Sequence, residues 1–170
     1  MARAATRGND RTVCGLVSAR ALDAKPACIP NGRPRGVKAR GISYEKACAA
    51  ALQGAFPKSG VAHGQWFEFA DVNGRGYAQV DLLLYIVALD QYVVGECKLT
   101  DVAGARQKLA NFYLPIVAMA FGKRASGFVV TRHLTQLSDV RNVCATFRDA
   151  LGAALNGGLP TWHYLGKGPP

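Results

Sequence analysis

The stretch YAQVDLLLYIVALDQYVVGECKL, residues 77–99, decides the fold of this chain. It contains two strand-like runs, residues 77–87 and 91–99, with a tight connection between them. Strands joined so closely pair antiparallel. The first run is apolar on both faces after Asp81, which is typical of a central strand in a sheet. The second run ends in Glu96-Cys97-Lys98.

Other elements are predicted on both sides of this hairpin. Upstream, Ser43 is a suitable cap for a helix over residues 44–56, and residues 66–70 read as a strand. Downstream, we expect a helix from about residue 102 that Pro115 kinks or ends. The inward stripe of this helix is expected to be Ala103, Gln107, Ala110 and Leu114.

The C-terminal part continues the alternation of strands and helices. Residues 126–131 read as a fourth strand, Ser138 as the cap of a helix to about residue 155, and residues 162–165 as a last strand. The order is therefore helix, three strands, helix, strand, helix, short strand. It predicts a mixed α/β fold, an α+β sheet flanked by helices.

Charge is unevenly placed along the 170 residues, whose net charge is +10. Residues 1–42 carry nine lysines and arginines against two aspartates, and their glycines and prolines break any regular pattern. We therefore expect a basic, largely irregular arm over 1–42 and one domain over 43–170. A basic arm favours a polyanionic partner, most simply nucleic acid, with a solubilising tail as the alternative.

Asp81, Glu96 and Lys98 are expected to meet on one face of the sheet. Glu96 and Lys98 are two residues apart on a strand, so their side chains share a face about 6–7 Å apart, and Cys97 points to the other face for packing. If the turn is centred between Ala88 and Leu89, Asp81 lies opposite Glu96. If it is centred one residue later, Asp81 lies opposite Lys98. Either register puts Asp81 at roughly 4.5–8 Å from Glu96.

Two carboxylates and a lysine at this spacing suit metal-assisted cleavage of a phosphodiester. Aspartate and glutamate oxygens are ligands for a hard cation such as Mg²⁺ or Mn²⁺. The cation can hold a phosphate oxygen and lower the pKa of a bound water, while Lys98 orients that water or neutralises developing charge. The alternative is a surface salt-bridge cluster, which the surrounding apolar residues make costly.

Two more residues are candidates for the same site. Glu45 stands in the first turn of the expected helix and can point toward the sheet, or can simply favour the helix dipole. Gln107 heads the expected inward stripe and can bond a phosphate, or can be an ordinary boundary residue. His63 is placed in a loop before the first strand, where a structural role is favoured over contact with a substrate.

With these residues in place, the chain resembles the PD-(D/E)XK nuclease superfamily over about residues 43–131. The resemblance implies a restriction-endonuclease-like core: helix, three-stranded meander, helix, strand. It implies that Asp81 and Glu96 bind Mg²⁺, that Lys98 is catalytic, and that Glu45 is an added ligand. Glu45 and Gln107 resemble the branch of RecB-type nucleases and archaeal Holliday-junction resolvases. Residue 80 is Val rather than Pro, and Asn111 stands where that branch has tyrosine.

The function we predict is a Mg²⁺-dependent deoxyribonuclease. The alternatives are a non-cleaving nucleic-acid-binding module of the same fold and an RNA nuclease. DNA, branched or single-stranded forms included, is the expected partner, and a homodimer is left open. Contacts with the nucleic-acid backbone are expected from a set of basic residues: Arg33, Arg35, Lys38, Arg40, Arg75, Arg106 and Lys108.

The remaining features bear on location and cysteine chemistry. No secretory signal or membrane span is evident, so we expect a cytoplasmic protein, with nucleoid, phage and mobile-element settings left open. The five cysteines are scattered without a CxxC pair, which favours reduced thiols over a zinc site.

Overall fold

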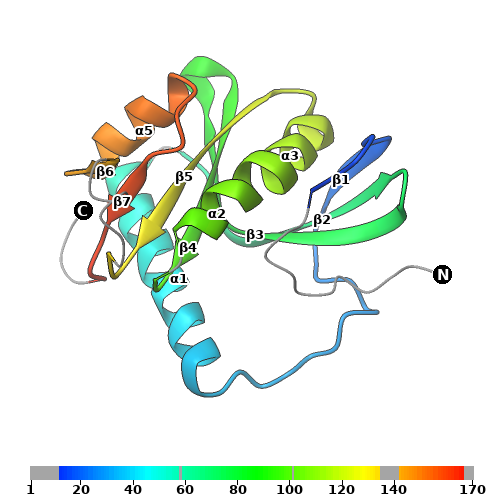
Figure 1. Cartoon of the computed structure of the whole chain (residues 1–170), viewed down its shortest axis with the longest axis horizontal. Helices are drawn as coiled ribbons and strands as arrows, with labels where there is room; N and C mark the ends of the chain where they lie inside the picture. Colours follow the sequence, from blue (N-terminus) through cyan, green and yellow to red (C-terminus); the bar gives the residue numbers. More distant parts are fainter. Residues whose placement is uncertain (1–11, 58, 101, 135–141, 167–170) are drawn as a thin grey trace.

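Figure 1 shows the computed structural model of the chain, which describes residues 12–57, 59–100, 102–134 and 142–166. The elements in chain order are β1 (Ser18–Leu22), α1 (Gly36–Ala55), β2 (Val61–Asp71), β3 (Gly74–Ile86), the 3₁₀ turn η1 (Val87–Leu89), β4 (Gln91–Lys98), α2 (Ala103–Lys108), the π-helical turn η2 (Leu109–Tyr113), α3 (Leu114–Phe121), β5 (Arg124–Thr131), β6 (Val143–Cys144), α5 (Phe147–Leu155) and β7 (Thr161–His163).

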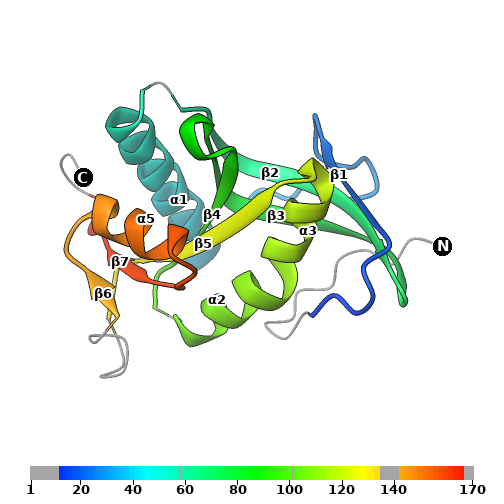
Figure 2. The same ribbon diagram turned by 90° about the horizontal axis from the view of Figure 1, so that it is seen from above.

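The strands form one mixed sheet in the order β1-β2-β3-β4-β5-β7-β6. The strands β1 to β4 pair antiparallel, whereas β4, β5, β7 and β6 pair parallel. Helices α1 and α5 cover one face, and α2 and α3 cover the other (Figure 2). The predicted mixed α/β fold is confirmed, and the succession α1, β2–β3–β4, α2, β5 is the restriction-endonuclease-like core order.

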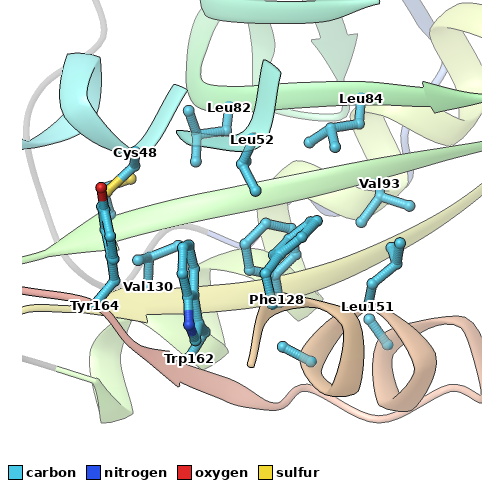
Figure 3. Close-up of a cluster of buried hydrophobic side chains, with 14 of the residues drawn as sticks. Cys48, Leu52, Leu82, Leu84, Val93, Phe128, Val130, Leu151, Trp162 and Tyr164 are labelled. Atoms are coloured by element: carbon cyan, nitrogen blue, oxygen red, sulfur yellow. The ribbon is translucent and has the colours of Figure 1, made fainter. Parts of the chain in front are cut away.

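Each face of the sheet has its own apolar core. The first core lies under α1 and α5 and includes Leu52, Leu82 and Phe128, as Figure 3 shows. The second lies under α2 and α3 and includes Phe67 and Leu109. Because central strands contribute to both cores, they read as nearly continuous apolar runs in the sequence.

The pairing of β3 with β4 is short and fixes the register. Leu82 lies opposite Gly95, and the pairing runs from there to Ile86 opposite Gln91. The same register, continued by one residue, sets Asp81 across from Glu96. This is the first of the two predicted registers, with the turn centred between Ala88 and Leu89.

Beyond Asp81, β3 leaves β4 and continues as a hairpin with β2. We call this part of the sheet the wing; it consists of β1 with residues 65–71 of β2 and 74–80 of β3 (Figure 1). Where the wing begins, the alternation of side chains between the two faces of the sheet is interrupted on both strands. Val80 belongs to the second core and Leu82 to the first, and across from Asp81 stands Gly64, with a positive φ of 69° that favours glycine.

Several expected boundaries are corrected by the structure. The arm is not irregular throughout its described part, because β1 pairs with β2, and α1 begins at Gly36 rather than residue 44. His63 lies on β2 rather than in a loop. These elements form because the sheet supplies pairing and packing partners that local sequence does not show. The division into an arm and a domain stays a prediction.

The last helix is also shorter than expected. It begins at Phe147, where Thr146 and Asp149 form a capping box in which each side chain bonds the other residue's backbone N–H. Ser138, the expected cap, lies outside the described residues. All five cysteines are free. In the described part of the chain, no helix combines the length and the apolarity that crossing a membrane requires.

Candidate active site

The candidate site lies at the fork where β3 and β4 separate. Past Gly95, β4 keeps its parallel partner β5 as far as Lys98 opposite Thr131, but its pairing with β3 has ended. In place of a strand partner, Asp81 Oδ2 accepts a hydrogen bond from the backbone N–H of Cys97, at 2.8 Å. The fork thus brings a carboxylate to the backbone of the Glu96-Cys97-Lys98 segment.

Glu96 is the centre of the site. Its side chain is fully buried, and its Oε1 lies 2.7 Å from Lys98 Nζ and 3.0 Å from Lys108 Nζ. Its Oε2 is buried with no hydrogen-bond partner among the described residues. A buried carboxylate oxygen without a partner is costly. The predicted alternative, a surface salt-bridge cluster, does not fit a fully buried glutamate.

Glu45 approaches the same site from α1. Because α1 begins at Gly36, Glu45 lies in its third turn, beyond the reach of the dipole effect at the N-terminus. Its Oε2 lies 3.5 Å from His63 Nε2 of β2. Burial raises the pKa of Glu45, and the charge of Glu96 raises it further.

The carboxylates act on one another electrostatically. Burial raises the pKa of Asp81 well above its usual range, and the charges of Glu96 and Glu45 raise it further. The hydrogen bond from the Cys97 backbone and the Lys98 charge oppose this rise. Asp81, Glu96, Lys98 and Glu45, all predicted from the sequence, are therefore brought together, and Cys97 packs in the first core as expected.

Gln107 does not take the inward position expected of it. The residues of the expected stripe are largely exposed, Gln107 among them, and the buried stripe is Val102, Ala105, Leu109 and Phe112. The larger apolar side chains of this second stripe gain more by burial and set the rotation of the helix. The neighbouring residue, Lys108, turns toward Glu96 instead.

Two of the residues predicted to contact the nucleic-acid backbone have partners within the protein. Arg106 donates from Nε to the Leu159 carbonyl at 3.1 Å and from Nη2 to Thr161 Oγ1 at 2.6 Å, which ties α2 to the start of β7. Lys108 belongs to the Glu96 cluster. The other predicted contacts are exposed: Arg33, Arg35, Lys38, Arg40 and Arg75.

Two residues of the site were missed by sequence reasoning. Lys108 was assigned to a phosphate contact, although the spacing of Val102, Ala105 and Leu109 could have indicated its inward rotation. His63 was assigned to a loop, and no local signal shows its approach to Glu45, which depends on how α1 packs on β2.

The donor set of the site is oxygen-rich. In the parts of the chain that the structure describes, no three histidine, cysteine, aspartate or glutamate side chains are arranged as a metal-binding group. Mg²⁺ is commonly bound through one or two carboxylates, with waters and substrate phosphate completing its shell. Asp81 and the unpartnered Oε2 of Glu96 match that chemistry.

Comparisons with known proteins give distant structural likenesses. No family model and no curated protein matches the sequence. A type III CRISPR defence DNA nuclease activated by cyclic oligoadenylate is similar with a TM-score of 0.43 and 19% identity, over 74% of this chain and 21% of that one. Protein VC1899 from Vibrio cholerae is similar with a TM-score of 0.40 and 12% identity, over 71% of this chain and 28% of that one.

These likenesses are too distant to carry an argument about activity. The chain also spans only 21% and 28% of the two proteins' own lengths. One neighbour is a nuclease by name. Membership of this chain in the PD-(D/E)XK superfamily stays an expectation. What the chain does must be argued from its own site.

Proposed function

We propose that this chain is a metal-dependent nuclease that hydrolyses DNA phosphodiester bonds at the fork between β3 and β4. The observation that carries the proposal is the state of Glu96: fully buried, held by Lys98 and Lys108 on one oxygen and without a partner on the other. A glutamate that only stabilised the fold would have both oxygens satisfied. A free, buried carboxylate oxygen beside a second carboxylate suits a bound cation.

Asp81 and Glu96 would hold Mg²⁺ or Mn²⁺, with Glu45 as an added ligand. When bound, the cation supplies Lewis-acid activation of the phosphate and of the attacking water. The unpartnered Oε2 of Glu96 fits this role because a cation would satisfy it. The raised pKa of Asp81 also fits, since neighbouring negative charges cause part of the rise and a cation would offset them.

The lysines perform two different tasks in this proposal. Lys98 is 27% exposed at the side chain, so its ammonium group can reach both Glu96 and a substrate in the fork. There it orients the attacking water and stabilises the negative charge that develops on the phosphate. Lys108 lies on α2, where its ammonium group pairs with Glu96 Oε1 and fixes the position of that carboxylate.

The test is a cleavage assay with Mg²⁺ or Mn²⁺ on duplex, single-stranded and branched DNA and on RNA. We expect cleavage of DNA by the native chain and its loss in Glu96→Gln and Lys98→Ala. Asp90→Asn is the matched control, because Asp90 is a carboxylate that pairs with Lys123 at the start of β4, at the opposite end of that strand from Glu96. Circular dichroism of each variant separates loss of activity from loss of folding.

Three results would contradict the proposal in different ways. Binding of nucleic acid without cleavage of any substrate would favour the non-cleaving module. Cleavage of RNA alone would favour the RNA nuclease. Cleavage unchanged by both substitutions would move the site elsewhere. Whether the chain forms a homodimer stays open, and sedimentation of the purified chain would test it.

A further inference from the structure

The outer face of the wing carries aromatic side chains that the apolar cores do not use. Phe67 and Phe69 of β2 point into the second core, so Trp66 and Glu68 point to the opposite, outer face. Trp66 is half-buried and is a member of neither core cluster of the described residues. On the neighbouring strand, Tyr77 lies opposite Glu68 and is also half-buried.

This outer face lies on the α1 side of the sheet and ends beside Asp81 at the fork. Trp66 pairs with Gln79, and Gln79 is two residues from Asp81, or about 6.6 Å along β3. A strand of nucleic acid lying on the wing would therefore reach the fork within one or two nucleotides.

The charges of the face suit a polyanion. Arg20 of β1 pairs with Glu68 at 2.6 Å, and the arginine side chain is 71% exposed while the glutamate is 18% exposed. The pair therefore presents its cation to solvent and covers its anion. Arg75 is exposed at the far end of the same face.

An open hollow on the surface beside Tyr77 has the chemistry to contact a base. Its volume is about 500 Å³, and its lining includes Arg20, Asp23, Cys28, Glu68 and Tyr77. The Tyr77 ring suits the face of an unpaired base, and the Asp23 carboxylate suits its amino groups better than it suits a phosphate. A side-chain hydrogen bond with Cys28 raises the pKa of Tyr77.

The segment that links the wing to α1 is basic. Residues 23–35, which we call the strap, run from β1 to the N-terminal end of α1 (Figure 1). Lys25 Nζ holds the strap by donating to the Pro30 carbonyl at 2.7 Å and to Asn31 Oδ1 at 2.8 Å. Lys38 follows on α1, seven residues before Glu45, which places it on the same helix face about 10 Å away.

From these observations we infer that the wing is a binding surface for single-stranded DNA, with bases stacked on Trp66 and Tyr77 and the backbone tracked by Arg20 and Lys38. The inference rests on the proposed function, whose substrate it specifies. Stacking on aromatic side chains requires unpaired bases, whereas a duplex keeps its bases stacked on each other. The combination of a basic track with aromatic platforms is the usual arrangement for binding single strands.

Intrinsic fluorescence provides a direct test, because the chain has two tryptophans and Trp162 is only 3% exposed. The native chain in EDTA, where metal-dependent cleavage is off, is titrated with a single-stranded 20-mer and with the same sequence as a duplex. We expect the single strand to quench the emission of Trp66 and to bind more tightly than the duplex. Trp66→Phe should lose the quenching and keep most of the affinity, since phenylalanine also stacks.

Substitutions then separate stacking from charge. Trp66→Ala is expected to weaken single-strand binding roughly tenfold to a hundredfold, the range measured for loss of one stacked base. Lys38→Ala should weaken binding and reduce its salt dependence. Arg148→Ala is the control for charge, because Arg148 is exposed on α5, away from the wing.

The inference is overturned if the duplex binds as tightly as the single strand, or if Trp66→Ala binds like the native chain. Neither result would affect the proposed nuclease, which the cleavage assay tests separately. Conversely, a chain that binds single strands through Trp66 but cleaves nothing would keep the surface and refute the enzyme. Folding of each variant is checked by circular dichroism, and Tyr77→Phe and Tyr77→Ala provide a second pair if Trp66→Ala does not fold.

Discussion

The carboxylate of Asp81 accepts a hydrogen bond from the backbone N–H of Cys97, with 2.8 Å between Oδ2 and the nitrogen. The bond closes the fork at the place where strand pairing between β3 and β4 stops. It satisfies a backbone donor that the departing strand would leave free. It also holds Asp81 beside Glu96, so one interaction supports both the fold of the fork and the geometry of the candidate site.

Replacing Lys108 tests whether α2 holds the buried glutamate. Lys108→Ala removes one of the two ammonium groups on Glu96 Oε1. We expect the free energy of unfolding to fall by about 1–2 kcal/mol, the usual range for a hydrogen bond to a charged group, reduced for partial exposure. Urea denaturation measures the change. Gln107→Ala, at the exposed neighbouring position, should stay within about 0.5 kcal/mol of the native chain. Equal effects of the two substitutions would show that Lys108 does not support Glu96.

Gly95 tests how tightly β4 is packed next to Glu96. A Cβ added at Gly95 would lie 2.9 Å from Phe128 Cζ and 3.0 Å from Leu82 Cδ1. Gly95→Ala should therefore lower the free energy of unfolding by about 1–3 kcal/mol, because two buried side chains must move. It should also lower cleavage, since β4 would shift beside the site.

A second glycine gives the matched control for this substitution. Gly152 lies within α5, and a Cβ there would meet nothing within 4 Å. Gly152→Ala should stabilise the chain by about 0.4–1 kcal/mol. Thermal unfolding of both variants compares them. A stabilising Gly95→Ala would mean that the packing around β4 has room that the structure does not show.

The turn between β3 and β4 predicts an acid-sensitive contribution to stability. Hydrogen bonds from Lys123 and Tyr85 lower the pKa of Asp90. Because the pKa is lowered by folding, the stabilisation is complete above the pKa of Asp90 in the unfolded chain, about 3.9. It is lost as the pH falls through the lower pKa of the folded chain. Asp90→Asn should remove this part of the acid dependence while keeping the left-handed backbone, φ 48°, that asparagine also tolerates.

The measurement for Asp90 is the midpoint of thermal unfolding between neutral pH and about pH 2. The native chain should lose more of its midpoint over this range than Asp90→Asn does. Parallel curves for the two chains would show that the Lys123 and Tyr85 contacts with Asp90 do not stabilise the fold in solution.

Glu45 is expected to contribute to metal binding less than Glu96 does. Glu45 is partly exposed and contacts His63, whereas Glu96 is fully buried with a free oxygen. Isothermal titration of Mn²⁺ should therefore show weaker binding by Glu45→Gln and a larger loss by Glu96→Gln. Unaltered binding by Glu45→Gln would remove Glu45 from the ligand set.

Much of the central sheet could be predicted from the sequence because the patterns that indicate its strands are local. The short connection before Gln91 required an antiparallel hairpin, and its two allowed registers both brought Asp81 near Glu96. Alternation along β4 set Glu96 and Lys98 on one face and Cys97 on the other. The apolar runs that mark β3, β4 and β5 reflect burial on both faces, which the two cores confirm.

The predictions that failed concern features that are set by packing between distant parts of the chain. The predicted rotation of α2 was wrong because packing on the sheet buried a different face of the helix, the one that carries the larger apolar side chains. β1 lies in the segment that was predicted to be largely irregular, because a short edge strand has little propensity of its own and forms on the surface that β2 provides.

The sequence by itself determined the element order, the hairpin and the convergence of Asp81, Glu96 and Lys98, since these follow from strand period and chain length alone. Only the tertiary structure decided that β3 forks from β4, that Lys108 rather than Gln107 faces Glu96, and that Trp66 lies outside both cores. The physical reason is that these features depend on which surfaces are buried against which, and burial is a property of the whole fold rather than of any local segment.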